Sequence, residues 1–496
     1  MMQVLNNQES LWYFLPELAL VATFVLIFIL DLLPSIKNQK RALPIVAAIG
    51  VVFFLGLSVY VQQFPQALLF HGMIVGDSFT DFFRLFAGVS TLFALYFSVK
   101  SKELAKVKAE YWALILGIAL GLPILAASNN LLMIYLSLEL VSILSYVVVG
   151  SIYGSRASSE AALKYVLYGA TASGIMIYGL SLLFGVSGTL DAIQIKAFLL
   201  SHPMERLPLF IGLLMTMAGF GYKVSMVPFH MWAPDVYQGA PTPVTSYLSV
   251  GPKAAGFAIL LRFVYTALTT HNGADFEPIK SVDISGLMSV FAVATMTLGN
   301  VVAMWQKDTK RMLAYSSIAH AGYMLMAVAA LNQQAIEGIL FYLSAYLVMN
   351  FGAFGVAQAV MQESGTQDLE SFKGLAKRGS KGSLAALAMT VFLISLTGLP
   401  PTIGFVGKFV LFSAVLEAKL YVLAVIGVLN SVVSLYYYAR IIKYMYFDDP
   451  LSEDKFSFGS RSYPVLITFL ALATLALGLF WEPLSVVVKN SAHLLS

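Results

Sequence analysis

The chain has 496 residues, of which 59% are hydrophobic and only 11% are charged, and its mean hydropathy is +0.80. Soluble globular domains carry about 25% charged residues, so the composition excludes a water-soluble globular protein and indicates a multi-pass membrane protein. The formal net charge is +4, and the absence of cysteine excludes thiolate-bound iron–sulfur clusters, cysteine-ligated zinc and disulfides in this chain. The first ten residues carry no Lys or Arg, so we expect the first apolar stretch to be a retained membrane helix rather than a cleaved signal peptide.

The apolar stretches predict an all-α polytopic membrane protein, with residues 1–496 forming a single membrane domain. They are long and continuous, unlike the alternating segments of about ten residues that form transmembrane β-barrels. Fourteen membrane-spanning segments are expected in chain order, at residues 11–33, 43–63, 79–98, 112–128, 130–151, 162–188, 208–228, 240–268, 283–303, 312–331, 337–362, 384–416, 420–447 and 463–488.

The distribution of basic residues supports this number of spans. Nineteen of the thirty Lys and Arg residues fall in one alternating set of loops, five fall in the opposite set, and six lie within spans or at their edges. Because cytoplasmic loops are enriched in Lys and Arg, we predict that the richer set is cytoplasmic and that both termini lie outside. The five basic residues of the opposite set are Lys196, Arg206, Lys280, Lys419 and Lys489.

Two blocks of five consecutive spans, residues 112–268 and 283–447, share a common pattern. The fourth span of each block is interrupted by proline, at Pro228 in the first block and at Pro400 and Pro401 in the second. Consecutive units with an odd number of spans must lie in opposite orientations across the membrane. We therefore predict two inverted five-helix repeats, with a functional site near each proline break.

Four ionisable residues lie well inside the predicted spans: Glu139, Lys223, Lys253 and Lys408. Each costs roughly 2.5–3.5 kcal/mol at the centre of a membrane helix, so we expect a function that retains them. Burial weakens the hold of a lysine on its proton, and a nearby carboxylate strengthens it again. Glu139 beside Lys223 is therefore predicted to form a tunable pair in a proton relay, and the proline breaks are predicted to admit water. The alternative for any one lysine is a structural salt bridge inside the bundle.

Two histidines are further candidates for the relay. His320 lies in a helix of small residues and His230 lies beside the first proline break, and each could either transfer protons or only form hydrogen bonds within the fold. Three basic residues, Arg84, Lys164 and Arg262, lie near the ends of their spans. We expect their side chains to extend to the membrane interface.

No motif for bond-making catalysis is present in the sequence. The stretch WAPDVYQGAPTP around Asp235 is expected to join two helices rigidly, or to organise nearby charges. There is no glycine-rich phosphate-binding loop and no HExxH motif. The chain alone is therefore expected to catalyse no bond chemistry and to hold neither a metal nor an organic cofactor.

Several long motifs resemble those of one known family. The stretch YKVSMVPFHMWAPDVYQGAPTPVTSYLSVGPKAAGFA at residues 222–258 closely resembles the signature of the subunit N family of bacterial NADH:quinone oxidoreductase, or complex I. The segments LPELAL (15–20), NVVAMWQKDTKRMLAYSSIAHAGYML (300–325) and GLPPTIGFVGKF (398–409) are also similar to that family, and the resemblance covers essentially the whole chain. The related subunit M family has glutamate where Lys408 stands, so Lys408 favours subunit N.

The resemblance implies specific roles for the buried residues. Glu139 and Lys223 would form a modulating pair, Lys253 and His320 would be central relay residues, and Lys408 would connect to the outer side.

The resemblance also implies what surrounds the chain. FMN, iron–sulfur clusters and quinone would belong to partner subunits, and adjacent antiporter-like and small membrane subunits would be neighbours in the lipid bilayer. The expected location is a bacterial cytoplasmic (inner) membrane, in preference to a plastid or mitochondrial membrane. Two alternatives remain: a subunit of a multisubunit cation/proton antiporter without redox chemistry, and an inert scaffold that only bridges pump subunits.

Overall fold

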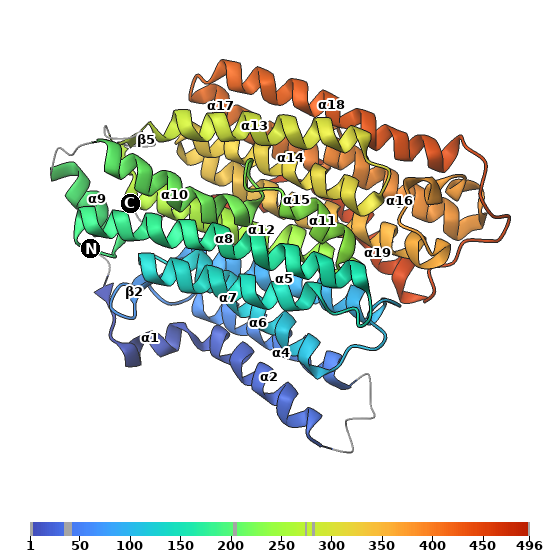
Figure 1. The fold of residues 1–496 in the computed structure, drawn as a ribbon, viewed down its shortest axis with the longest axis horizontal. Coiled ribbons are helices and arrows are strands. Elements are labelled where there is room, and N and C mark those ends of the chain that lie inside the picture. Colours follow the sequence, from blue (N-terminus) through green and yellow to red (C-terminus); the bar gives the residue numbers. More distant parts are fainter. Residues whose placement is uncertain (1–2, 34–41, 202–205, 273–274, 280–282, 495–496) are drawn as a thin grey trace.

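The computed structural model describes residues 3–33, 42–201, 206–272, 275–279 and 283–494. Its helices run side by side in one elongated bundle, and the two marked chain ends lie at the same end of that bundle (Figure 1). Thirteen helices in the described residues are long and apolar enough to cross a membrane. A fourteenth span is formed if the pair α1 and α2, bent by 79°, counts as one. The prediction of an all-α membrane protein with about fourteen spans is confirmed.

The long helices correspond to the predicted spans in order. Their bounds are α2 (Leu15–Asp31), α4 (Ala42–Val61), α5 (Ser78–Val99), α6 (Ala109–Ala127), α7 (Leu131–Val149), α8 (Arg156–Ser187), α10 (Arg206–Val224), α12 (Thr242–Ala267), α13 (Ile284–Trp305), α14 (Thr309–Ala330), α15 (Gln333–Ser364), α16 (Gly379–Thr397), α18 (Tyr421–Tyr446) and α19 (Ser462–Leu479). Lys280, one of the basic residues used to predict the topology, lies outside the described residues.

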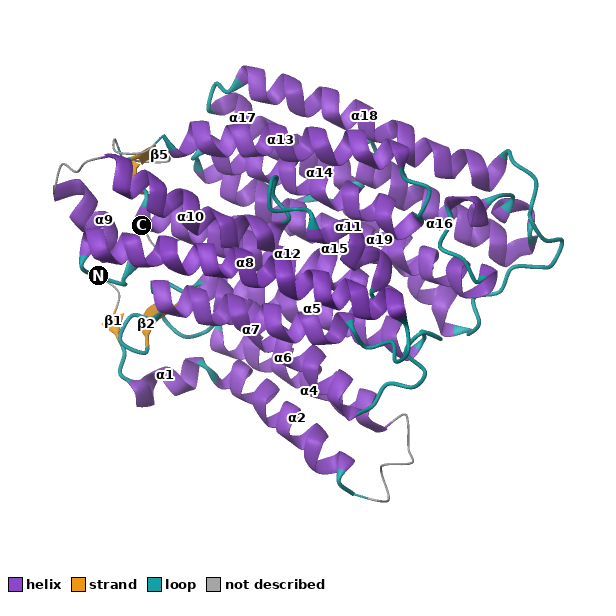
Figure 2. Cartoon of the chain, in the orientation of Figure 1, coloured by secondary structure: helices purple, strands orange, loops and turns teal. Residues whose placement is uncertain are grey.

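Short elements occupy the connections and the breaks. The short helices are α1 (Asn7–Tyr13), α9 (Ala192–Ser201), α11 (Trp232–Gly239), α17 (Ile403–Glu417), α20 (Glu482–Ser491) and the 3₁₀ turns η1 (Leu369–Phe372) and η2 (Leu375–Lys377). Five short strands, drawn in orange in Figure 2, were not predicted: β1 (Gln3–Val4), β2 (Ala67–Leu69), β3 (Ile74–Gly76), β4 (Thr269–Asn272) and β5 (Asp275–Pro278). β2 pairs with β1 in parallel and with β3 in antiparallel, and β4 pairs with β5 in antiparallel.

The least apolar spans form the centre of the bundle. α12, α14 and α15 are almost entirely buried, although α12 and α14 are among the least hydrophobic of the candidate spans. The very apolar α4 and α19 lie at the periphery, where only 33% and 22% of their apolar windows are buried inside the protein. In a bilayer the surrounding solvent is hydrocarbon, so polar side chains are held inside the protein and apolar ones face outward. This arrangement places the ionisable residues of α12 and α14 in the core.

Both predicted proline breaks are confirmed. α10 ends at Val224 and α11 starts at Trp232, with Pro228 between them, whereas α16 ends at Thr397 and α17 starts at Ile403, after Pro400 and Pro401. The segment 384–416, predicted as one interrupted span, is therefore two helices. The peptide bonds preceding Pro228 and Pro401 are cis.

The two predicted repeats contain the same helix pairs. α6 packs on α7 and α12 in the first block, and α13 packs on α14 and α18 in the second. The long helix of each block, α8 or α15, packs on both halves of its broken helix: α10 and α11, or α16 and α17. The inverted relation between the blocks stays a prediction.

Candidate functional site

Glu139 and Lys223 form the first part of the polar axis in the bundle core. Lys223, near the end of α10, is 3% exposed, and its Nζ donates to Ser142 Oγ on α7 at 3.1 Å. Ser142 lies one helical turn after Glu139, which accepts a hydrogen bond from Ser173 Oγ on α8. Among the described residues Lys223 has no direct ion pair, but Glu139 acts on it electrostatically. The two residues of the predicted tunable pair are therefore not in direct contact: Lys223 binds the Ser142 hydroxyl, and Glu139 binds the Ser173 hydroxyl.

Lys253 lies on α12, which packs against α10 and is the most buried of the spans. It is 2% exposed, and its Nζ donates to the carbonyl oxygen of Ser317 on α14 at 2.8 Å. The stem of Lys223 packs on α12 at Gly256, one turn from Lys253. A Cβ added to Gly256 would lie 3.1 Å from Lys223 Cγ. The absence of a side chain at Gly256 therefore allows the first lysine to lie against the helix that carries the second.

His320 lies on α14 one turn after Ser317, between two tyrosines that the sequence analysis did not single out. Its Nδ1 is 2.5 Å from Tyr342 Oη on α15 and its Nε2 is 3.1 Å from Tyr438 Oη on α18. With a hydroxyl at each ring nitrogen, the imidazole can accept a proton at one nitrogen and release one at the other. Lys253 and Lys408 both act on His320 electrostatically, so it lies within range of both lysines.

Lys408 forms the far end of the axis, on α17 after the second break. It is 4% exposed, and its Nζ donates to the Thr397 carbonyl oxygen at 2.8 Å and to Ser431 Oγ at 3.2 Å. Its ammonium group also lies 4.5 Å from the ring centroid of Tyr323 on α14, a cation–π distance. Gly398 has a φ of +90°, and a Cβ there would lie 2.6 Å from Lys408 Cδ. The break at Gly398 therefore makes room for the lysine stem.

One helix links these groups. Ser317, His320 and Tyr323 follow each other at three-residue spacing on α14, so they lie on one face. Their contacts are with Lys253, with the two tyrosines and with Lys408, respectively. The three-residue spacing of these polar residues among the small and apolar residues that follow Ser317 was the sequence signal that could have identified this face.

None of the three lysines is held by a salt bridge in the described part of the chain. Lys223 and Lys253 each use one of three possible N–H donors on a protein oxygen, and Lys408 uses two. Removing one partner from a buried ion pair would leave an unpaired charge, which is strongly destabilising. These lysines can gain or lose a proton without breaking such a pair, so the structural alternative of a salt bridge does not apply to them.

His230 is the predicted site residue that is not joined to the axis. It lies between α10 and α11, is 7% exposed, and its Nδ1 has no hydrogen-bond partner among the described residues. No hydrogen bond between His230 and the other candidate residues is present in the described ranges.

A polar cavity lies where α8, α11 and α14 meet the loop after α15. This connector cavity has a volume of about 590 Å³ and is lined by Glu160, Lys164, Asp235, Gln238, Arg311 and Asp368, among others. Lys164 pairs with both Glu160 and Asp235 at 2.7 Å, and Arg311 also pairs with Asp235. Burial raises the pKa of the Asp235 carboxyl, but hydrogen bonds from Lys164 and Arg311 hold that pKa below its usual range. Asp235 therefore organises nearby charges, one of the two roles predicted for it.

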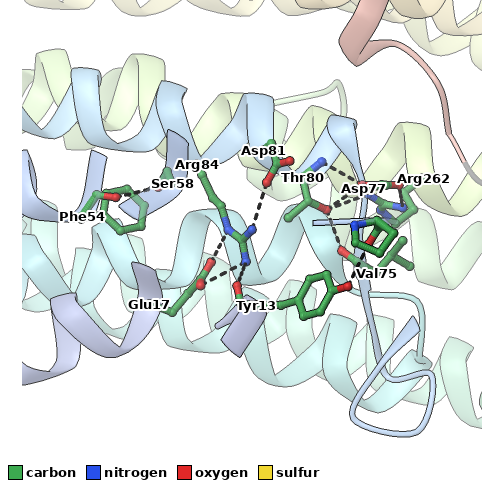
Figure 3. A network of polar contacts seen from close by, with 11 residues as sticks. Tyr13, Glu17, Phe54, Ser58, Val75, Asp77, Thr80, Asp81, Arg84 and Arg262 are labelled. Atoms are coloured by element: carbon green, nitrogen blue, oxygen red, sulfur yellow. Dashed lines mark hydrogen bonds and ion pairs between the residues drawn. The ribbon is translucent and has the colours of Figure 1, made fainter. Parts of the chain in front are cut away.

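Two arginines expected at the membrane interface are instead buried. Arg84 is 2% exposed, and its Nε donates to Glu17 at 2.7 Å. Arg262 is 1% exposed and binds both carboxylate oxygens of Asp77 at 2.9 Å (Figure 3). The expectation was wrong because each arginine pairs with a buried carboxylate from elsewhere in the bundle. Glu17 lies on α2, and Asp77 lies directly before α5. Lys164 is 37% exposed and lines the connector cavity, and its place at the membrane interface stays a prediction.

No group of three or more His, Asp or Glu side chains in the described residues is placed to hold a metal ion. The polar axis consists of amine, imidazole, carboxylate and hydroxyl groups. Such groups can accept and donate protons, and they carry no redox chemistry of their own.

Comparisons with known proteins show the family of the chain. Residues 128–434 match the family described as "NADH:quinone oxidoreductase/Mrp antiporter, TM". A Chloroherpeton thalassium protein named NADH-quinone oxidoreductase subunit N 2 is 45% identical over 491 residues, covering 97% of this chain and 94% of the relative. A Sorangium cellulosum protein of the same name is 44% identical over 518 residues, with 99% of both chains covered.

Solved structures show the same fold. A chain of respiratory complex I from Thermus thermophilus with bound aureothin is 28% identical with a TM-score of 0.79, and the match covers 96% of this chain and 99% of that one. A chain of the Mrp complex from a Dietzia species is 20% identical with a TM-score of 0.82, and 97% of each chain is covered. At that identity the second match shows a shared fold alone.

Proposed function

The chain belongs to the NADH-quinone oxidoreductase subunit N family, and from that premise we propose that it translocates protons along Glu139, Lys223, Lys253, His320 and Lys408. Subunits of this family are proton-translocating membrane subunits of a redox-driven translocase, and this chain carries no redox centre of its own. The proposal concerns the route that the proton takes.

One observation carries this proposal. Lys223, Lys253 and Lys408 are each at least 96% buried, yet each bonds only to neutral oxygens rather than to a carboxylate. A structural lysine in a membrane bundle is expected to pair with a counter-ion, whereas a relay lysine must change its protonation state in place. The neutral partners fit the second role.

The order of the groups along the bundle supports a stepwise relay. Glu139 acts on Lys223 electrostatically, and Lys223 lies against the helix of Lys253. His320 lies within electrostatic range of Lys253 and Lys408 and can exchange protons through its two hydroxyl neighbours. His230 has no such contact, and we place it beside the route rather than on it.

The setting of the chain follows from its family. We assign FMN, the iron–sulfur clusters and quinone to partner subunits, and we expect the chain to be driven by quinone reduction through adjacent antiporter-like and small membrane subunits. The chain is a multi-pass membrane protein, and its bacterial relatives support a place in the bacterial inner membrane. The excess of basic residues in one set of loops supports termini on the outer side.

The two blocks 112–268 and 283–447 are proposed to be inverted repeats. The equivalent helix pairs and the two proline breaks support this relation. Each broken helix then brings one lysine to its block, Lys223 before the first break and Lys408 after the second.

A second candidate function is cation/proton exchange without redox chemistry. The fold that the chain shares with a chain of the Mrp complex favours this candidate. It predicts that a sodium gradient alone drives proton movement through the isolated membrane subunit. The proposed function instead predicts that proton movement requires quinone reduction in the whole complex.

The proposal is tested with Lys223→Ala and Lys408→Ala in the complete complex reconstituted into vesicles. Both variants are expected to assemble and to lose most proton pumping, together with coupled NADH:quinone turnover. Lys377→Ala is the control, because that lysine is 43% exposed and pairs with the exposed Asp449. Normal pumping by assembled Lys223→Ala and Lys408→Ala complexes would favour the scaffold alternative and end the relay proposal.

A further inference from the structure

A buried network of two asparagines and two tyrosines lies beside the Lys408 end of the polar axis. Its members are Asn300 on α13, Tyr323 on α14, and Asn430 and Tyr437 on α18, which are 0%, 1%, 7% and 0% exposed. We call this group the amide network. Asn300 opens the segment 300–325 that resembles the family, yet it has no part in the relay proposed above.

Asn300 is the centre of the amide network. Its Nδ2 donates to Tyr323 Oη at 3.0 Å and to Asn430 Oδ1 at 3.2 Å, and its Oδ1 accepts from Tyr437 Oη at 2.9 Å. Asn430 Nδ2 donates in turn to Thr297 Oγ1 at 3.2 Å. Both N–H donors of Asn300 are used, and a satisfied buried network of this kind rigidifies the helices that it joins. Asn300 therefore ties the Tyr323 hydroxyl to both α13 and α18.

Tyr323 connects the amide network to the relay. Its hydroxyl accepts the hydrogen bond from Asn300, and its ring centroid lies 4.5 Å from Lys408 Nζ. The face of an aromatic ring attracts an ammonium group electrostatically, and the attraction is strongest where water is excluded. In the described part of the chain neither Lys223 nor Lys253 has an aromatic ring at this range. The terminal lysine is therefore held differently from the other two.

α18 carries two pairs of adjacent residues in which one member belongs to the amide network and the other contacts the polar axis. Asn430 is followed by Ser431, whose Oγ accepts a hydrogen bond from Lys408 Nζ at 3.2 Å. Tyr437 is followed by Tyr438, whose Oη lies 3.1 Å from Nε2 of the relay histidine. Adjacent helical residues point about 100° apart, so fixing one member of a pair also fixes the direction of the other. The amide network therefore sets the rotation of α18 that presents both hydroxyls to the axis.

We propose that Asn300 is a positioning residue for the relay: through Tyr323 and α18 it fixes the ring face and the Ser431 hydroxyl that hold the Lys408 side chain. The proposal rests on the relay described above and assigns the placement of its terminal lysine to the amide network. Asn300 itself exchanges no proton, because an amide is not among the titratable side chains. Without the fixed ring, the Lys408 amine is less often held where it can accept and carry the proton, so pumping slows.

The test uses Asn300→Leu and Tyr323→Phe in the complete complex reconstituted into vesicles. Asn300→Leu removes every hydrogen bond of the amide, whereas Tyr323→Phe keeps the ring and removes only the hydroxyl that Asn300 holds. The matched control is Gln358→Leu, which removes another buried amide that joins two helices. Gln358 on α15 is 2% exposed, and its Nε2 donates to the Phe97 carbonyl on α5 at 3.1 Å.

Both variants are expected to assemble and to slow proton pumping by about tenfold, within the range for loss of a desolvated cation–π contact. In a Tyr323→Phe background Asn300→Leu should slow pumping by much less than it does alone, because the two residues share one contact. Tyr323→Trp, which keeps a ring face for the ammonium group, should pump faster than Tyr323→Leu. The solvent deuterium isotope effect on NADH turnover should increase in Asn300→Leu, because proton transfer at Lys408 limits the rate, and should stay unchanged in Gln358→Leu.

A purely structural network predicts a different result. Asn300→Leu would then slow pumping only as far as Gln358→Leu does, with an unchanged isotope effect. That result, or normal pumping by the assembled Asn300→Leu and Tyr323→Phe complexes, would overturn the proposal. Tyr323→Phe removes a single oxygen atom, so it decides the question on its own if Asn300→Leu does not assemble.

A Lys408→Ala complex separates the two levels of the proposal. If Lys408→Ala stops pumping while Asn300→Leu and Tyr323→Phe pump at the normal rate, the positioning role is refuted and the relay stands. If Lys408→Ala also pumps normally, the relay itself is refuted.

Discussion

The buried ion pair between Arg262 and Asp77 predicts a large and specific loss of stability. Arg262 donates two parallel hydrogen bonds of 2.9 Å to Asp77 and one of 3.1 Å to the Thr80 hydroxyl (Figure 3). It also donates one of 2.6 Å to the Ala126 carbonyl. Both charged side chains are at most 1% exposed. The contacts join α12 to the start of α5 and the end of α6.

Removing one partner leaves the other charge buried without a counter-ion. Breaking a buried pair in this way costs about 3–5 kcal/mol, or roughly two to four powers of ten in the ratio of folded to unfolded protein. Arg262→Met is therefore expected to destabilise the subunit by that amount. The double variant Arg262→Met, Asp77→Asn should recover most of the loss, because both charges are gone and the asparagine can still cap α5 at Thr80.

The assay is heat-induced loss of this subunit from the purified complex, followed by native electrophoresis. Lys377→Met provides the comparison, because it removes an ion pair of 3.0 Å whose side chains are 43% and 97% exposed. Such a surface pair contributes at most about 1 kcal/mol. An Arg262→Met variant no less stable than Lys377→Met, or a double variant as unstable as Arg262→Met alone, would contradict this prediction.

Three further predictions concern the axis and the connector cavity. Gly398→Ala should reduce proton pumping while the complex still assembles, because the added Cβ would lie 2.6 Å from the Lys408 stem and the backbone there has a φ of +90°. Unchanged pumping would contradict the role of this break. Tyr342→Phe removes the hydroxyl 2.5 Å from His320 Nδ1 and should lower the pumping rate, measured as acidification of reconstituted vesicles, by about tenfold. An unchanged pumping rate would show that His320 is not on the proton path. The pKa of Asp235 is depressed, so its charged form stabilises the fold at pH values above the usual pKa of about 3.9. Asp235→Asn should therefore be less stable than wild type in thermal melts at pH 7, and the difference should vanish as the pH falls below that value.

Much of the fold could be predicted from the sequence because the bilayer imposes simple rules. Apolar length sets the spans, and proline removes a backbone donor, so the helices and both breaks follow from local sequence. The burial of Lys223, Lys253 and Lys408 was predicted for the same reason, since each lies within a predicted apolar span.

The contacts that define the site could not be predicted in this way. Arg262 and Asp77 are 185 residues apart, and only the order in which helices pack brings them together. Likewise, Tyr438 reaches His320 across 118 residues. A span-by-span reading therefore placed Arg262 at the membrane interface, and it gave no role to the tyrosines beside His320.

The central claim is that the buried lysines act by changing their protonation state, and arginine at these positions tests it most directly. Arginine keeps the positive charge and the hydrogen-bond donors but is not deprotonated in proteins. We therefore predict that Lys253→Arg and Lys408→Arg complexes assemble with NADH-driven proton pumping close to that of the alanine variants. Pumping at the wild-type rate by either arginine variant would show that a fixed positive charge is sufficient there, and would contradict the account.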